Sequence, residues 1–124
     1  MFSVLRLQRT CVGLYLASVG LQVYAAGLAL FGVTSFVPHA VLGYLMIIGA
    51  LLLFLLTAAA RQSRRALGFA ALIVVLAVLQ PVLVLVVRST SPALAALHPL
   101  NAILMVTLAM LIARSTEHPA GSMT

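Results

Sequence analysis

The chain has 124 residues, of which 65% are hydrophobic and 6% charged, and it carries a net charge of +6. Its mean hydropathy is +1.27. Soluble globular domains are about 45–50% apolar, so this composition excludes an ordinary soluble fold and indicates an integral membrane protein. At this length we expect a single domain.

Four stretches are long and apolar enough to cross a membrane, which takes roughly 20 residues each. They lie at about 11–32, 38–60, 67–87 and 93–113. The first apolar run continues through Phe31, which favours a membrane span over a short cleaved signal peptide. Short connections force consecutive spans to be antiparallel, so we predict an all-α bundle of four transmembrane helices in up-down-up-down order.

Prolines and small residues mark helix starts, bends and contacts. Pro38 is placed to open the second helix, and Pro81 should bend the third. The fourth helix has two alternative starts, either at Pro99 after a short interfacial helix over 92–97, or at Ser91-Pro92 with a kink at Pro99. Small residues recur every seven positions and predict close helix packing: Gly13, Gly20 and Gly27 on the first helix, and Gly43, Ala50 and Thr57 on the second.

The arginines are distributed unevenly over the loops. An alternating topology brings only Arg88 to one side of the membrane, and the other six to the opposite side: Arg6, Arg9, Arg61, Arg64, Arg65 and Arg114. By the positive-inside rule both termini should be cytoplasmic, in a bacterial inner (cytoplasmic) membrane. The basic charge then reflects topology, with the lipid bilayer as neighbour, and we expect no nucleic-acid binding.

The second and fourth spans carry the same motif. Residues 39–50 (HAVLGYLMIIGA) align without a gap on residues 98–109 (HPLNAILMVTLA). A Leu-Gln pair precedes each copy, with Gln22 lying 17 residues before His39 and Gln80 lying 18 residues before His98. The bundle is therefore expected to consist of two helix-pair repeats with two-fold related polar side chains.

Helical periodicity places each motif on one helix face. The faces read His, small, Met from the outer end inward: His39, Gly43 and Met46 on the second span, and His98, Ala102 and Met105 on the fourth. Diagonal helices would direct both imidazoles toward one slot, and neutral imidazole is a good ligand for haem iron. We therefore expect His39 and His98 to be the metal ligands of a haem b, with the small residues and methionines in contact with the macrocycle.

Three further polar residues are candidates for the same site. Gln22 and Gln80 could hydrogen-bond a cofactor edge, and Arg88 could meet haem propionates. Tyr24 and Tyr44 could add rings beside the slot. The alternatives stay open: each histidine could simply lie in the interface, with its imidazole bonded to water or a carbonyl, the glutamines could join helices, and Arg88 could be an interface anchor.

Missing groups exclude several functions. The chain has no aspartate, and its only carboxylate is Glu117 in the polar tail. Proton and sodium relays usually need an ionisable residue within the membrane, which disfavours a coupled transporter. No hydrolytic or phosphate-binding motif is present in the sequence, so we predict no catalytic residues and leave enzymatic activity open.

The pattern as a whole resembles one four-helix half of the haem A synthase family and small b-type membrane cytochromes, including uncharacterised bacterial four-span proteins. The resemblance spans roughly residues 14–113 and rests on Gln22, His39, Gly43, Gln80, His98 and Asn101. It implies that His39 and His98 are the axial ligands of a b-type haem. The chain lacks a second histidine pair and the carboxylate expected of that enzyme, so haem oxygenation is not implied.

The function expected from these observations is electron transfer through a bis-histidine haem near the outer face. A quinone or a respiratory complex is the expected partner, and homo-oligomers are compatible with the small-residue stripes. The alternatives are a non-redox accessory subunit of a larger membrane complex and a binding protein for a small hydrophobic ligand.

Overall fold

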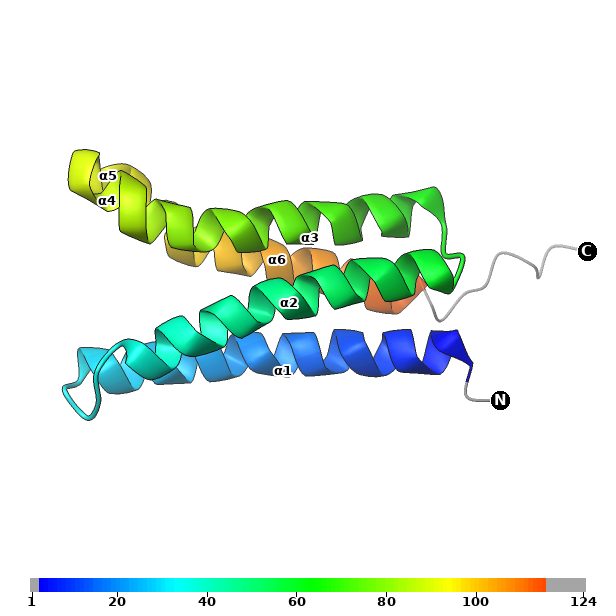
Figure 1. Ribbon diagram of the computed structural model, residues 1–124, viewed down its shortest axis with the longest axis horizontal. Helices are drawn as coiled ribbons and strands as arrows, with labels where there is room; N and C mark the ends of the chain where they lie inside the picture. Colours follow the sequence, from blue (N-terminus) through cyan, green and yellow to red (C-terminus); the bar gives the residue numbers. More distant parts are fainter. Residues whose placement is uncertain (1–2, 116–124) are drawn as a thin grey trace, which may run out of the picture.

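The computed structural model describes residues 3–115, and these residues form helices joined by short turns (Figure 1). Four helical stretches are long and apolar enough to cross a membrane. The first two are α1 (Val4–Leu30) and α2 (Val37–Ala59). The third stretch joins α3 (Arg64–Val82), the π-helix η1 (Leu83–Val87) and α4 (Arg88–Thr90). The fourth joins α5 (Pro92–Ala95) and α6 (Leu97–Ser115). The protein is therefore a multi-pass membrane protein, as the sequence predicts.

The helices form an antiparallel four-helix bundle. Packed neighbours are α1 with α2, α2 with α3, α3 with α6, and α6 with α1. Helices α2 and α6 therefore face each other across the bundle axis, and Figure 1 shows the N-terminus at the same end of the bundle as the end of α6. This arrangement confirms the predicted fold class, two antiparallel helix pairs in one bundle. It also directs the two histidine-bearing helices toward a common centre.

Alanines on the inner faces let the helices approach one another closely. Ala50, Ala70 and Ala109 are completely buried and alternate along the axis with the buried Leu53 and Ile73. Small side chains at helix contacts matter in a membrane because association there depends on packing. Large apolar side chains on the outer faces remain exposed, as expected for surfaces that contact lipid.

The glycines of α1 do not contribute to this packing. No heavy atom lies within 4 Å of a Cβ built on Gly13, Gly20 or Gly27. The prediction that this stripe packs inside the bundle is therefore wrong, because the stripe lies on the outward face of the helix. Gly43 on α2 does face a neighbouring side chain, and it is described with the site below.

The end of the bundle near α4 and α5 departs from regular geometry. Pro81 lies inside α3, and the π-helical segment begins two residues later. Proline has no N–H to donate to the preceding turn, and π-turns are one way a helix accommodates such an irregularity. After Ser91 the short helix α5 comes first, and α6 then begins at Leu97, so Pro99 lies in its first turn. Of the two predicted starts of the fourth helix, the structure agrees better with the one in which a short separate helix comes first.

Candidate functional site: a pair of histidines between diagonal helices

His39 is held at the start of α2 by the backbone of α1. Pro38 lies in the first turn of α2, where a missing N–H costs no helical hydrogen bond. The imidazole Nδ1 of His39 lies 3.1 Å from the carbonyl oxygen of Gln22. A carbonyl oxygen can only accept, so Nδ1 carries the proton, and Nε2 of the neutral ring keeps its lone pair.

His98 repeats this arrangement in the second helix pair. Its Nδ1 lies 3.3 Å from the carbonyl oxygen of Gln80 on α3, so Nδ1–H again donates to a glutamine backbone. The Gln…His spacing noticed in the sequence is therefore a backbone-to-ring hydrogen bond in both pairs. Ligating histidines commonly donate their second ring N–H to a carbonyl in this way, which fixes the orientation of the ring.

The two imidazoles meet between the diagonal helices. Their ring centres are 6.0 Å apart and their planes are inclined by 62°. The ring of Phe36, 6.2 Å from that of His39 and nearly perpendicular to it, lies against the pair. Both histidines are partly buried. The sequence thus identified two side chains, 59 positions apart, that the fold brings into contact distance.

The side-chain amides of the two glutamines lie differently. The Nε2 atom of Gln22 lies 2.9 Å from the position of a Cβ on Gly43, so this amide fills the space that the glycine leaves. The Nε2 atom of Gln80 instead lies 3.8 Å from the sulfur of Met105. In both residues the Oε1 atom is buried and has no hydrogen-bond partner. Gly43 therefore accommodates Gln22 directly, a role that sequence reasoning had assigned to a cofactor slot.

Asn101 adds a polar contact beneath His98. Its Nδ2 donates to the carbonyl oxygen of Leu76 across 2.9 Å, and the side chain is buried. This bond joins α6 to α3 one turn inside the histidine. The corresponding residue of the first repeat is Leu42, so no equivalent bond can form there.

The remaining predicted site residues lie at different distances from the pair. Met46 and Met105 are buried in the core, and Ala102 is partly buried on α6. Arg88 is exposed on α4, at the same end of the bundle as the histidines. Tyr24 and Tyr44 are 63% and 52% exposed, so the expectation that they line the slot is wrong, and both face the surroundings of the bundle.

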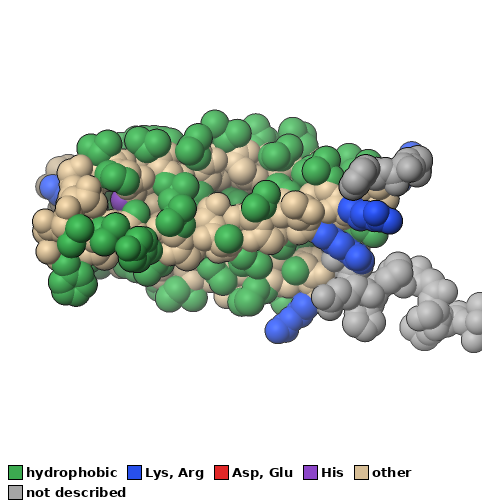
Figure 2. Space-filling view, turned by 90° about the horizontal axis from the view of Figure 1, so that it is seen from below, with side chains coloured by type: hydrophobic (Ala, Val, Ile, Leu, Met, Phe, Trp, Pro, Cys, Tyr) green, Lys and Arg blue, Asp and Glu red, His purple; other side chains and the backbone are tan. Residues whose placement is uncertain are grey.

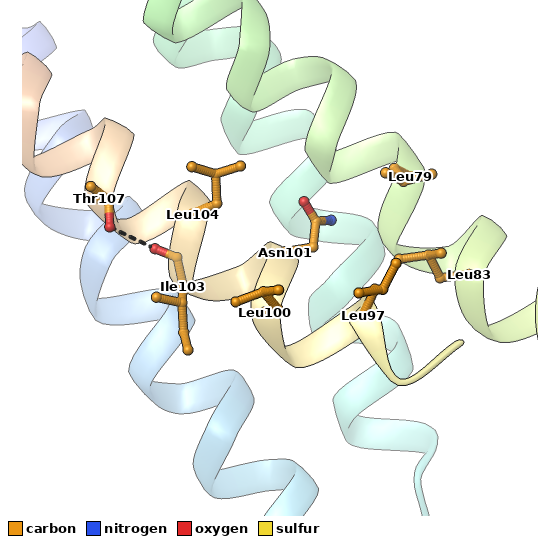
Figure 3. Close-up of a pocket in the computed structure, with 8 residues that line it drawn as sticks. All are labelled: Leu79, Leu83, Leu97, Leu100, Asn101, Ile103, Leu104 and Thr107. Carbon is orange, nitrogen blue, oxygen red and sulfur yellow. Dashed lines mark hydrogen bonds between the residues drawn. The ribbon is translucent and has the colours of Figure 1, made fainter. Parts of the chain in front are cut away.

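A groove opens next to this site on the outside of the bundle. It lies between α3 and α6, has a volume of about 430 Å³, and is almost entirely apolar (Figure 3). Asn101 and Thr107 are its polar residues, and Thr107 donates to the carbonyl oxygen of Ile103. The remaining lining residues are Leu79, Leu83, Leu97, Leu100, Ile103 and Leu104. Neither histidine lines the groove, so it is separate from the slot between the rings.

A second polar cluster, which the sequence did not suggest, lies at the opposite end of the core. The amide of Gln8 donates to Thr57 Oγ1 over 3.4 Å, and Thr57 donates to the carbonyl oxygen of Leu53 over 2.7 Å. Gln8 Oε1 and the hydroxyl of Tyr15 are buried without a partner. Gln8, Tyr15 and Gln22 are spaced by seven residues on α1. This spacing places them on one helix face and could have indicated the cluster. It was missed because the first span was predicted to begin after Gln8.

The donor set limits what the site can hold. Within residues 3–115, no group of three or more His, Cys, Asp or Glu side chains is placed to bind a metal ion. The histidine pair offers two imidazole nitrogens as possible ligands.

Comparison with known proteins gives a family without a function. No curated protein sequence matches the chain, and no solved structure matches it either. Residues 22–89 match the profile of DUF6220, described as a family of unknown function. The match includes Gln22, His39, Gln80 and Arg88 and ends before His98. Because it covers more than half of the chain, the protein belongs to the DUF6220 family.

Proposed function

We propose that this protein binds one b-type haem between α2 and α6, that His39 and His98 would hold its iron, and that the protein transfers electrons. The observation that carries the proposal is the pair of imidazoles whose Nδ1–H groups are both tied to glutamine carbonyls. Each ring then offers Nε2 as its free donor atom. Two helix pairs contribute one ligand each, at matched positions of a repeated motif.

The separation of the rings supports coordination of one ion between them. With metal–nitrogen bonds of about 2 Å, two imidazoles that ligate one ion in line have ring centres roughly 6.4 Å apart. The observed separation is 6.0 Å. The two separations are close, and the ring planes are inclined by 62° to each other.

The two glutamine side chains are among the groups that a macrocycle would have to displace. Gln22 fills the space above Gly43, and Gln80 lies toward Met105. Both are flexible, and both leave Oε1 without a hydrogen bond, so moving them disrupts few interactions. Met46 and Met105 would then supply adaptable apolar contacts, and Arg88 would offer a positive charge to the carboxylates of the haem.

The residues of this chain suit electron transfer better than catalysis. When bound, the haem supplies one-electron redox chemistry. His39 and His98 would hold the iron from two different helices, and the glutamine carbonyls hold both rings in place. The uneven arginines favour a bacterial inner membrane with both termini in the cytoplasm, so the haem would lie near the outer face, where a quinone or a respiratory complex can exchange electrons with it.

A single metal ion is the second candidate, and one observation favours it. The slot beside the rings holds the Gln22 amide, so a small ion would require less rearrangement than a macrocycle. Imidazole is a suitable ligand for zinc and copper ions. Metal analysis separates the two readings, because a bare ion gives bound metal without a porphyrin spectrum.

The absorption spectrum of the protein purified from haem-supplied cells tests the proposal. We expect a Soret band with sharp α and β bands on reduction with dithionite, and loss of these bands in both His39→Ala and His98→Ala. His118→Ala, which removes the third histidine of the chain, is the matched control and should retain them. A colourless wild-type protein, or an unchanged spectrum in either of the first two variants, contradicts the haem assignment.

A further inference from the structure

One end of the bundle carries a dense ring of arginines. This arginine rim consists of Arg6 on α1, Arg61 after α2, Arg64 and Arg65 at the start of α3, and Arg114 near the end of α6. Figure 2 shows most of the visible basic side chains at the end opposite the histidine, with a smaller basic area at the histidine's own end. Residues 3–115 include no aspartate or glutamate, and Glu117 follows Arg114 by three residues in the sequence.

The helix dipoles add positive potential at this end of the bundle, which favours the binding of an anion. Arg6 on α1 and Arg64 and Arg65 on α3 lie in the first turn of their helices, and neither turn contains an acidic residue. The N-terminal end of a helix is its positive end, where negative groups stabilise and positive groups destabilise. Negative charge at the rim would relieve both the mutual repulsion of the arginines and their repulsion by the dipoles.

The surface next to the rim combines charge with apolar contacts. A groove of about 370 Å³ on α1 is lined by Val4, Arg6, Leu7 and Thr10. Val4 and Leu7 are exposed, so they offer apolar contact beside the guanidinium of Arg6. On α3 the guanidinium of Arg65 lies 5.4 Å from the centre of the Phe69 ring, a cation–π contact that keeps this charge close to the helix.

We propose that the arginine rim binds the phosphate groups of anionic phospholipids, with an acyl chain lying along Val4 and Leu7. A phospholipid matches both halves of the surface, because its headgroup is negative and its chains are apolar. Arginine suits this role since its guanidinium forms paired hydrogen bonds to phosphate oxygens. The site goes beyond the proposed haem function, because it lies at the other end of the bundle and involves no histidine.

Thermal unfolding in defined vesicles tests this site. The protein is reconstituted in two kinds of vesicle: one of phosphatidylcholine alone, and one in which phosphatidylglycerol makes up roughly one third of the lipid. Phosphatidylglycerol should raise the unfolding midpoint by several degrees, and 1 M salt should remove most of the shift. The double variant Arg64→Gln/Arg65→Gln, and Arg6→Gln alone, should lose part of it.

Arg88→Gln is the matched control, since Arg88 is the arginine at the other end of the bundle. It should retain the full shift. An equal loss in Arg88→Gln, or no shift with phosphatidylglycerol, overturns the proposal. The same holds if inorganic phosphate in phosphatidylcholine vesicles reproduces the shift, because the rim would then bind a free anion.

Native mass spectrometry of the detergent-extracted protein gives a second measurement that does not depend on unfolding. Phosphatidylglycerol should remain bound to the wild type and to Arg88→Gln, and it should be depleted from Arg64→Gln/Arg65→Gln. Equal retention by all three proteins contradicts the site. A colourless protein that still binds phosphatidylglycerol would reject the haem and leave the lipid site intact.

Discussion

The two helix pairs hold their histidines in the same way and their glutamines differently. In α1–α2 the amide of Gln22 lies over Gly43, whereas in α3–α6 the amide of Gln80 turns to the sulfur of Met105. The residue that corresponds to Gly43 is Ala102, whose methyl group would crowd an amide placed as that of Gln22 is. The hydrogen bond from the histidine to the glutamine carbonyl is present in both pairs because it depends on how the helices are placed. The position of the glutamine side chain instead depends on whether the small residue carries a methyl group.

The pairs also differ in how the chain turns between their helices. The first pair uses a short turn between Leu30 and Val37. The second passes through Pro81, a π-helical turn and two short helices, and it places one more residue between glutamine and histidine. Despite this, both Nδ1 atoms reach a glutamine carbonyl at a similar distance. The hydrogen bond is thus common to two different local structures.

The largest difference between the pairs should follow from enlarging the small residue below each histidine. Gly43→Leu places a bulky side chain where the Gln22 amide lies, and we expect a loss of about 1–3 kcal/mol in the free energy of unfolding from overpacking. Ala102→Leu should cost less, because the Gln80 amide already lies elsewhere. Unfolding in detergent titrated with SDS measures both losses of stability. Equal losses would show that Gly43 does not provide a specific space for the Gln22 amide.

A smaller effect is expected from removing the polar contact that only the second pair has. Asn101→Leu deletes the hydrogen bond to the carbonyl oxygen of Leu76, and we expect it to cost about 0.5–1.5 kcal/mol in the same unfolding assay. The variant makes the second repeat match the first, which has Leu42 at this position. A stability equal to wild type would mean that Asn101 does not help to join α3 and α6.

The smallest effect should come from exchanging the two small residues. In Gly43→Ala the added Cβ would lie 2.9 Å from Gln22 Nε2, so the amide should turn toward Met46 as that of Gln80 does toward Met105. Because the displaced group is the end of a flexible side chain, we expect a cost below about 1 kcal/mol. The chemical shifts of the Gln22 side-chain amide in an NMR spectrum report the move, and Ala102→Gly is the converse variant. Unchanged Gln22 shifts would contradict the explanation of the asymmetry.

Much of the fold was predictable because membrane spans follow from composition and length. The four spans, their antiparallel order and the diagonal placement of the second and fourth helices all follow from apolar runs and short loops. Helix starts were less predictable. The first helix begins at Val4, well before the predicted span, because polar residues such as Gln8 extend a helix as readily as apolar ones.

The site was predictable to the level of the histidine pair and no further. Repetition of the motif in a chain with few polar residues was enough to select His39 and His98. The lipid-facing positions of Tyr24 and Tyr44 and the outward glycines of α1 were not predictable, because periodicity defines helix faces but not which face meets the bundle.

The amino-acid sequence by itself determined that this is a four-span membrane protein and which side chains recur in its two halves. These properties depend on local hydrophobicity and spacing, which are independent of how the helices pack. Only the tertiary structure decided that both Nδ1 atoms bond glutamine carbonyls and that the rings lie 6.0 Å apart. It also decided that the Gln22 amide lies against Gly43. Such contacts depend on the rotation and closeness of helices, which inter-helical packing sets.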